Sequence, residues 1–334
     1  MYMRFVMKKL IPLLMVACLV FASCGTKKSE SKQVKIGIAK IVQHPALDAV
    51  EQGIIDVIKE NGIDAQFDLQ NANGDVNTAA QIASEYKVKK VDVAVGIATP
   101  VAIALSTTLK ETPVVFGTVT DPLSAGLVDT LDHGKNNVTG MSDAIPTVEH
   151  IKLFAKITGI KTLGYIYTSN EANSVSSLEL VKQGCDEAGI ALVTQAITQS
   201  SEVKQAAETI IGRVDGIYLT TDNTVFSAIA SLVDVFGRAK KPIFSGDVTA
   251  AKDGGIFMAS GFNYYKAGRA TGDIVVQILN GKSPAEIPVR FMTDPSDSDL
   301  LIDLDAAKAC GITVPAEYVN SANMIFENGK LIEK

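Results

Sequence analysis

The chain has 334 residues, of which 47% are hydrophobic and 6% aromatic. This length and apolar content suit one or two globular domains with sizeable cores and exclude a disordered chain. The 31 Lys and Arg residues against 37 Asp and Glu give a formal net charge of -6. An acidic chain lacks the clustered basic surface that general phosphate-backbone binding needs, so we expect no nucleic-acid partner.

The first 23 residues have the pattern of an export signal. A basic start is followed by an apolar run at 10–21 and by the small residues Ala22 and Ser23 before Cys24. The apolar run is short for a membrane span. Removal of Arg4, Lys8 and Lys9 with this segment would change the net charge from -6 to -9.

The four residues that end this segment resemble a lipobox, although Phe21 stands where Leu is usual. The resemblance implies that the Cys24 thiol is diacylated, for example with palmitate, and becomes the new N-terminus. Residues 24–33, polar and rich in Ser and Lys, then fit a flexible tether. An ordinary cleaved signal peptide and a transmembrane anchor remain alternatives.

Two cysteines lie beyond the signal, Cys185 and Cys310, far apart and in helical patterns. Two such thiols make no disulfide framework, and we expect both to be free and buried. The three histidines and the absence of CxxC and HExxH motifs give no metal site. We therefore predict no metal and no cofactor.

From Val34 onward, short β-rich apolar runs alternate with helical segments, which is typical of parallel sheets with helices on both faces. In the first half we expect strands at 34–39, 65–69, 91–97 and 114–119, and helices at 45–61 and from near 76 and 100. In the second half we expect helices at 147–157 and 174–188 and strands at 162–167, 191–196, 216–219 and 243–245. The chain then crosses back through a strand at 256–260, a helix at 264–279 and a strand at 287–291.

The two halves repeat each other. Thr99 lies eight positions after Val91, and Asp222 lies eight positions after Val214, each where a strand ends and a helix begins. Residues 113–117 likewise parallel residues 242–246. We infer an internal duplication, so the predicted fold is α/β with two doubly wound parallel-sheet lobes.

Short motifs in a fixed order resemble those of the TrpX-like ABC transporter substrate-binding proteins, nearly end to end. They are residues 34–39, 44–48, Thr99-Pro100, Thr120-Asp121-Pro122, Asn137-Val138-Thr139-Gly140, Thr221-Asp222-Asn223 and Gly246-Asp247. The resemblance implies a type I periplasmic-binding-protein fold with three crossovers between lobes. It also implies an amino acid ligand, often tryptophan, tyrosine or phenylalanine.

On this basis the N-lobe comprises residues 34–143 plus 261–286 and the C-lobe residues 144–260 plus 287–299, while residues 300–334 form a tail that packs on a lobe. Hinges near 141–145, 260–262 and 286–289 would let the lobes close on a ligand. The expected partners are an ABC permease and its ATPase. The protein would be a monomer in the cell envelope, lipid-anchored to the outer face of the cytoplasmic membrane or periplasmic.

Ligands of open parallel sheets bind beyond the carboxyl ends of the strands. Thr99 as N-cap and Pro100 as the first helical residue would present free N–H groups to a carboxylate, unless Thr99 only caps its helix. Asn173 and Ser174, on the opposite lobe, are candidates to close on the same carboxylate.

An ammonium group needs a carboxylate held nearly dry. Asp222, Asp247 and Asp121 are the candidates, of which we favour the first two, and each has an alternative role as an N-cap or turn residue. His44 either contacts the ligand or lines its loop, and Asn223 follows Asp222 at the same edge.

Four aromatic residues are possible contacts for an apolar or aromatic ligand. Phe116 and Phe244 lie within strands, which favours core packing. Tyr264 and Tyr265 follow the second crossover, so that one of them, in our prediction Tyr264, faces the cleft.

An α/β fold of this kind also hosts other functions. An enzyme is disfavoured because the sequence has no GxSxG, P-loop or GxGxxG motif and no catalytic residues are predicted. A repressor would carry a helix-turn-helix where this chain has its signal and tether. A surface-exposed receptor or adhesin, or a binder of a different small polar solute, remains open.

Overall fold

The computed structural model describes residues 33–294 and 297–334. The described residues from 34 onward belong to one compact unit. The predicted signal peptide, Cys24 and nearly all of the tether lie outside the described residues. No described helix is long and apolar enough to cross a membrane.

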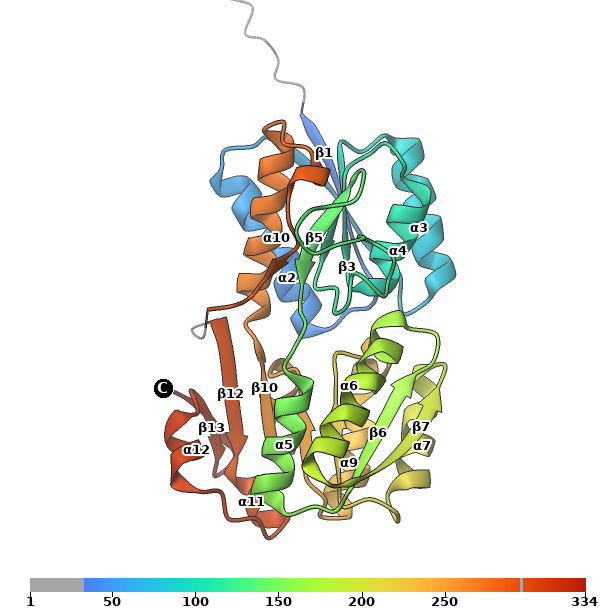
Figure 1. Cartoon of the computed structure of the whole chain (residues 1–334). Coiled ribbons are helices and arrows are strands. Elements are labelled where there is room, and N and C mark those ends of the chain that lie inside the picture. Colours follow the sequence, from blue (N-terminus) through green and yellow to red (C-terminus); the bar gives the residue numbers. More distant parts are fainter. Residues whose placement is uncertain (1–32, 295–296) are drawn as a thin grey trace, which may run out of the picture. The chain divides into compact units, whose positions relative to one another are not determined.

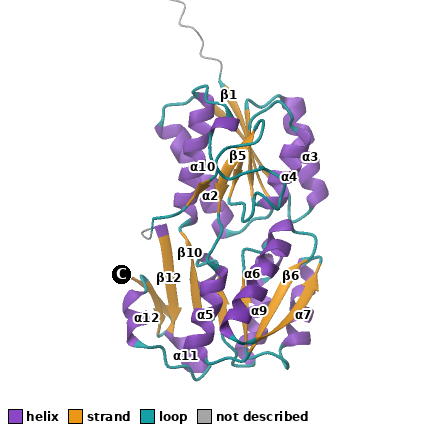
Figure 2. Cartoon of the chain, viewed as in Figure 1, coloured by secondary structure: helices purple, strands orange, loops and turns teal. Residues whose placement is uncertain are grey.

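The first lobe is built on a six-stranded sheet in which every pairing is parallel (Figures 1 and 2). Residues of β3 and β4 are all buried, because helices cover both faces of a parallel sheet. The strand order is β11 (Arg290–Phe291), β5 (Val138–Ser142), β4 (Val114–Gly117), β3 (Val93–Ile97), β1 (Val34–Lys40) and β2 (Ala65–Asn71).

Two pairs of helices cover this sheet, α2 (Pro45–Glu60) with α10 (Tyr264–Leu279) and α3 (Val76–Lys89) with α4 (Thr99–Thr108) (Figure 1). Helix α2 begins at His44, whose ring nitrogen accepts a hydrogen bond from the amide of Ala46. Helix α10 carries glycines where it meets α2, so the two backbones approach closely.

The second lobe is built on an eight-stranded sheet. Its order is β14 (Lys330–Glu333), β13 (Met324–Glu327), β12 (Ser298–Asp303), β10 (Met258–Phe262), β9 (Ile243–Ser245), β8 (Gly216–Leu219), β6 (Thr162–Thr168) and β7 (Ala191–Ile197). β6 to β10 pair in parallel, whereas β12 runs antiparallel to β10. The helices are α5 (Thr147–Thr158), α6 (Ala172–Ala188), α7 (Val203–Ile210), α8 (Asn223–Ser227), α9 (Ile229–Arg238), α11 (Leu304–Ala309) and α12 (Ala316–Ser321). Short 3-10 helices lie at Ser200–Glu202, Thr249–Ala251 and Pro284–Glu286.

The same strand order recurs in both lobes. β2-β1-β3-β4-β5 in the first corresponds to β7-β6-β8-β9-β10 in the second. Even a detail recurs, because Asp92 accepts a hydrogen bond from the amide of Lys35 and Asp215 accepts one from the amide of Lys161, both at 2.8 Å. The predicted two-lobed α/β fold is confirmed, and its symmetry agrees with an internal duplication.

The chain passes between the lobes three times, after β5, after β10 and between β11 and β12. The third passage was predicted too early in the sequence. β11 pairs with β5, and Ile287 and Val289 lie in the first core, so residues 287–291 belong to the first lobe rather than the second. The C-terminal segment from 300 does more than pack on a lobe, since β12, β13 and β14 extend the second sheet.

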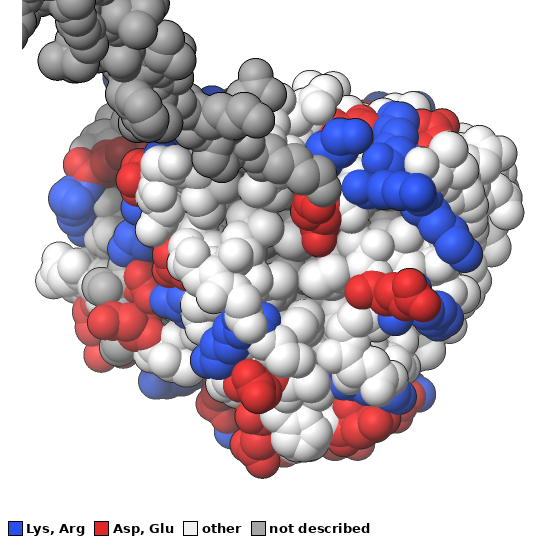
Figure 3. All heavy atoms as spheres, turned by 90° about the horizontal axis from the view of Figure 1, so that it is seen from above, with Lys and Arg blue, Asp and Glu red and all other residues white. Residues whose placement is uncertain are grey.

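The surface carries charges of both signs, and one of the two thiols is less buried than predicted. The face shown in Figure 3 carries both basic and acidic side chains, and several basic ones adjoin near one of its edges. Cys185 and Cys310 are both free, the first buried and the second half-buried. Burial raises the pKa of the Cys185 thiol to about 12, which leaves it un-ionised and unreactive at neutral pH.

Candidate functional site

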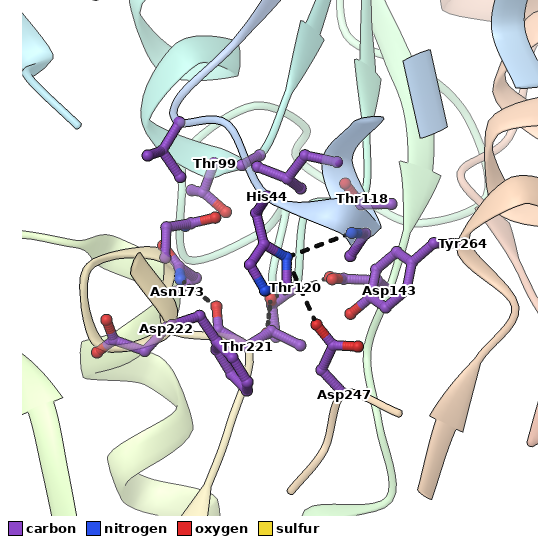
Figure 4. A pocket seen from close by; sticks show the side chains of 16 residues that line it. His44, Thr99, Thr118, Thr120, Asp143, Asn173, Thr221, Asp222, Asp247 and Tyr264 are labelled. Atoms are coloured by element: carbon purple, nitrogen blue, oxygen red, sulfur yellow. Dashed lines mark hydrogen bonds and ion pairs between the residues drawn. The ribbon is translucent and has the colours of Figure 1, made fainter. Parts of the chain in front are cut away.

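A pocket lies where the two lobes meet (Figure 4). Its walls are the loops that follow β1, β3 and β4 in the first lobe and β6, β8 and β9 in the second. In sheets of this order, the gap between the first and third strands is where ligands bind. The lining residues are Val42, His44, Ala46, Leu47, Ala98, Thr99, Thr118, Thr120, Asp143, Asn173, Thr221, Asp222, Asn223, Phe226, Asp247 and Tyr264.

The N-terminus of α4 forms one wall. Ala98 is the N-cap, with φ 74° and ψ 155°, a backbone region in which residues other than glycine are strained. Thr99 is therefore the first helical residue and not the predicted N-cap, and no side chain caps this helix end. The Thr99 hydroxyl is buried and has no hydrogen-bond partner among the described residues. Pro100 is the second helical residue and does not line the pocket.

Two carboxylates line the pocket, and each leaves one oxygen available to a ligand. Asp247 Oδ1 accepts hydrogen bonds from the Thr249 amide and hydroxyl, while Oδ2 lies 3.8 Å from His44 Nδ1. Asp143 Oδ1 accepts from the Thr120 hydroxyl at 3.0 Å. Burial raises the pKa of both groups, that of Asp143 to about 6, and the negative charge of Asp247 adds to the effect on Asp143. A cation in the pocket would stabilise the ionised form of both.

The carboxylate of Asp222 is used differently. Oδ1 accepts from the Thr168 hydroxyl and the Val225 amide, and Oδ2 accepts from the Thr168 amide and the Ser174 hydroxyl. Burial, followed by the nearby charge of Glu171, raises the pKa of Asp222 to about 7. With both oxygens already bonded, this side chain ties α8 and α6 to the end of β6 and has little left for a ligand.

Asn173 lies in the first turn of α6 and is 2% exposed. Its Nδ2 donates to the Thr221 carbonyl at 3.0 Å and to Glu171 Oε2 at 3.3 Å. Its Oδ1 is buried and has no partner among the described residues. Asn173 and Thr99, from opposite lobes, thus each present one unsatisfied polar atom.

Contacts across the cleft hold the lobes together around the pocket. The hydroxyls of Thr120 and Thr221, one from each lobe, lie 2.8 Å apart. The His44 ring meets the Phe226 ring edge-on, with 5.6 Å between centroids. Tyr264 adds a second aromatic wall and is 5% exposed. His44 therefore lines the pocket rather than only its own loop.

Seven predicted site residues meet in the pocket: His44, Thr99, Asn173, Asp222, Asn223, Asp247 and Tyr264. Three do not line it. Asp121 accepts from the Ser124 amide and hydroxyl as a turn residue, Ser174 bonds Asp222, and Pro100 lies within α4. Phe116 and Phe244 are fully buried core residues, as predicted, and the Tyr265 hydroxyl bonds Asp56.

Sequence reasoning missed two residues that give the pocket its character. Asp143 follows a strand that was not predicted, although it lies in the predicted hinge at 141–145. Phe226 comes four residues after Asp222, at the start of a helix. Residues four apart lie on the same face of a helix, so this spacing from a predicted site residue could have identified Phe226. The described residues hold no cluster of three or more His, Cys, Asp or Glu that could bind a metal.

Comparison with known proteins identifies the family. Residues 35–325 match the family model of the ABC transporter substrate binding proteins. The chain belongs to this family. Its members are binding proteins rather than enzymes, they work with ABC transporter components, and they act outside the cytoplasm.

Several relatives of this substrate-binding protein are characterised by name or structure. It is 33% identical over 294 residues to the tyrosine-binding protein of Clostridioides difficile, covering 86% of this chain and 84% of the relative. It is 31% identical to an ABC domain from Streptococcus pneumoniae solved in complex with L-Trp, with a TM-score of 0.83 over 88% of this chain and 100% of that one. A ligand-free, open substrate-binding protein with adhesive properties from Clostridium difficile is 33% identical, with a TM-score of 0.64 over 85% and 96%.

The last two similarities differ in a way that sequence does not explain. Identity is 31% to the L-Trp complex and 33% to the open structure, yet the TM-scores are 0.83 and 0.64. The backbone of this chain is thus more similar to that of the L-Trp complex than to that of the open structure.

Proposed function

We propose that this protein captures a free amino acid with an aromatic side chain in the pocket between its lobes. The observation that carries this proposal is the opposition of two kinds of group. Asp143 and Asp247 present carboxylate oxygens for an ammonium, while the uncapped N-terminus of α4 and the Thr99 hydroxyl present donors for a carboxylate. A zwitterion satisfies both.

The remaining walls suit an aromatic ring. His44, Phe226 and Tyr264 supply ring surfaces, and Val42 and Leu47 supply aliphatic ones. None of the sixteen lining residues is Lys or Arg, which disfavours an acidic ligand side chain. Tyrosine and L-tryptophan, the ligands in the names of two relatives, have such rings.

The site assignment departs from the sequence prediction at two points. Asp143 replaces Asp222 as a partner of the ammonium, because Asp222 already accepts four hydrogen bonds. Asn173 is not assigned to the carboxylate, since the group that it offers the pocket is an acceptor.

In the cell, we infer, the protein is a lipoprotein that delivers its ligand to an importer. Cys24 would carry the lipid and residues 24–33 would tether the body to the outer face of the cytoplasmic membrane. Ligand binding would favour closure about the three passages between lobes. An ABC permease with its ATPase would then recognise the closed monomer.

Ligand binding is tested with the full-length protein, expressed in bacteria and purified from membranes in detergent. Mass spectrometry after denaturation identifies any co-purified ligand, and thermal shifts are measured with each of the common amino acids. We expect tyrosine, tryptophan or phenylalanine to raise the melting temperature, since ligand at about 100 times Kd adds about 2.7 kcal/mol. No shift with any of them would refute the ligand class.

A matched pair of variants tests the site. Asp247→Asn removes a charge that faces the pocket, and we expect it to weaken binding about tenfold or more. Asp121→Asn removes a charge from a turn outside the pocket and should leave Kd unchanged. Equal Kd values for both variants would contradict the assignment of Asp247.

The lipid anchor has its own test. Cys24→Ser should release the protein from the membrane fraction, and the mass of the mature wild-type N-terminal peptide should include the acyl chains. A wild-type N-terminal peptide without acyl chains would show that the resemblance to a lipobox is misleading.

One relative suggests a second role, because the ligand-free protein from Clostridium difficile is described as having adhesive properties. Deletion of the gene distinguishes a role in transport from a role in adhesion. Loss of radiolabelled amino acid uptake with unchanged adherence to host cells would indicate transport alone, whereas the reverse would indicate an adhesin.

A further inference from the structure

Asn173 has a feature that the proposed function leaves unused. The described residues contain two buried side-chain atoms without a hydrogen-bond partner, Thr99 Oγ1 and Asn173 Oδ1, and both residues line the pocket. In the proposed function, the Thr99 hydroxyl donates a hydrogen bond to the ligand carboxylate. Asn173 Oδ1 is an acceptor, so a carboxylate cannot satisfy it.

The orientation of this amide is fixed by its surroundings. Nδ2 donates to the Thr221 carbonyl and to Glu171 Oε2, and a flipped amide would bring Oδ1 against those two acceptors. Glu171 cannot turn away, because Asn223 Nδ2 donates to it at 2.7 Å and the Thr224 hydroxyl at 2.6 Å. The pocket therefore always meets an oxygen at this position.

The ligand ammonium is held elsewhere. Figure 4 shows Asn173 on one side of His44, and Asp143, Asp247 and Tyr264 on the other. An ammonium directed at the two carboxylates points away from Asn173. The ligand side chain is left as the part of the ligand that offers a donor to Asn173 Oδ1, and the Phe226 ring lines the pocket from the same lobe as Asn173.

We propose that Asn173 Oδ1 accepts a hydrogen bond from an O–H or N–H group on the ligand's aromatic ring. The site then selects tyrosine or tryptophan over phenylalanine, which has no ring donor. A ring without a donor leaves a buried oxygen unpaired, and sites built to bond a substrate O–H or N–H reject such analogues strongly. The inference rests on the proposed function and adds a residue that decides specificity.

Isothermal titration calorimetry of the full-length protein in detergent tests the proposed role of Asn173. The ligands are tyrosine, tryptophan, phenylalanine, O-methyltyrosine and 1-methyltryptophan, of which the last three lack the ring donor. We expect wild type to bind tyrosine or tryptophan at least about tenfold more tightly than each matched analogue. In Asn173→Leu this preference should disappear, while the Kd for phenylalanine changes less than about threefold.

Asn137→Leu is the matched control. Its Nδ2 also donates to two carbonyls, those of Leu109 and Thr112, but it does not line the pocket. We expect it to lower the melting temperature and to keep the wild-type preference. If Asn173→Leu does not fold, comparing the wild-type Kd values for tyrosine and O-methyltyrosine still tests whether the ring donor is bound.

Three results would overturn the inference. Wild type could bind phenylalanine as tightly as tyrosine and tryptophan. Asn173→Leu could weaken all ligands equally, which would show that Asn173 holds the ammonium or only supports the fold. If no aromatic amino acid binds at all, the proposed function fails together with this assignment, whereas the first two results leave the proposed function intact.

Discussion

At the scale of single residues, the pocket concentrates groups that are unfavourable in an empty protein. Asp143 and Asp247 are carboxylates with little contact to water, and the Thr99 hydroxyl has no partner among the described residues. Each costs folding free energy unless a ligand compensates it. The residues that we propose to bind the ligand are therefore also residues whose replacement can stabilise the ligand-free protein.

The pH dependence of stability reports on Asp143. Burial raises the pKa of this carboxyl from 3.8 to about 6 in the folded protein, so it binds a proton that the unfolded chain has already lost. The contribution of Asp143 to the free energy of unfolding should rise as pH falls from above 6 toward 4, whereas that of the buried His150, whose pKa burial lowers to about 4, falls over the same range. The difference in pKa of Asp143 corresponds to at most about 3 kcal/mol.

Asp143→Asn isolates this contribution from those of Asp222 and Asp247, whose pKa values are also raised by burial. Urea denaturation at about pH 8 should find the variant more stable than wild type, with the gap closing near about pH 4. Parallel pH profiles for the two proteins would show that Asp143 titrates normally.

Thr99 allows stability and binding to be separated. Thr99→Val keeps the shape and removes an unpaired hydroxyl, so the ligand-free melting temperature should stay or rise, while affinity for the ligand falls about 2- to 10-fold. Calorimetry and thermal denaturation measure the two effects.

Thr271→Val is the control for Thr99→Val. The Thr271 hydroxyl donates to the Ala267 carbonyl within α10, away from the pocket. That variant should lose stability and keep affinity. A Thr99→Val protein that behaves in the same way would remove Thr99 from the binding site.

At the scale of elements, the first lobe depends on how closely α2 and α10 approach. A Cβ on Gly268 would lie 2.2 Å from the Val50 carbonyl oxygen, and one on Gly53 would lie 2.4 Å from the Tyr265 carbonyl oxygen. Both obstacles are backbone atoms and neither can rotate away. Since α10 begins with Tyr264, this packing also places one wall of the pocket.

Gly268→Ala should therefore destabilise the protein by about 2 kcal/mol or more, through forced separation of the two helices. Gly237→Ala, in α9, is the matched control, because a Cβ there meets nothing within 4 Å and alanine is the better helix former. Denaturant midpoints should move in opposite directions. A neutral Gly268→Ala would mean that the helices can separate at little cost.

At the scale of the whole molecule, the described residues form two lobes that meet around the ligand site. Few polar contacts cross the cleft, among them the Thr120 to Thr221 hydrogen bond and the approach of His44 to Asp247. Such contacts are individually weak. A ligand that bridges the lobes thus has decisive influence on whether they close.

We expect small-angle X-ray scattering to show a smaller radius of gyration when an aromatic amino acid is added, and no change with glycine. Thr221→Val removes one contact across the cleft and should leave a larger open fraction without ligand. An unchanged scattering curve in the presence of saturating ligand would argue against closure.

The sequence by itself determined the alternation of strands and helices, the repeat of one lobe in the other and seven of the sixteen residues that line the candidate pocket. Hydrophobic period and helix-start chemistry are local, and the carboxyl ends of parallel strands must gather at one edge, so Thr99, Asn173 and Asp247 were predictable. The strands β5 and β12, and with β5 the pocket residue Asp143, were missed because small and polar residues interrupt or flank their apolar residues.

Only the tertiary structure decided which groups remain free for a ligand. Asp222 and Asp247 look equivalent in sequence, yet the first has both oxygens occupied by Thr168, Ser174 and Val225, whereas the second keeps one oxygen toward His44. Hydrogen-bond saturation depends on partners that are distant in the chain. For the same reason, the fixed acceptor of Asn173 became visible only once Glu171 and Thr221 were in place around it.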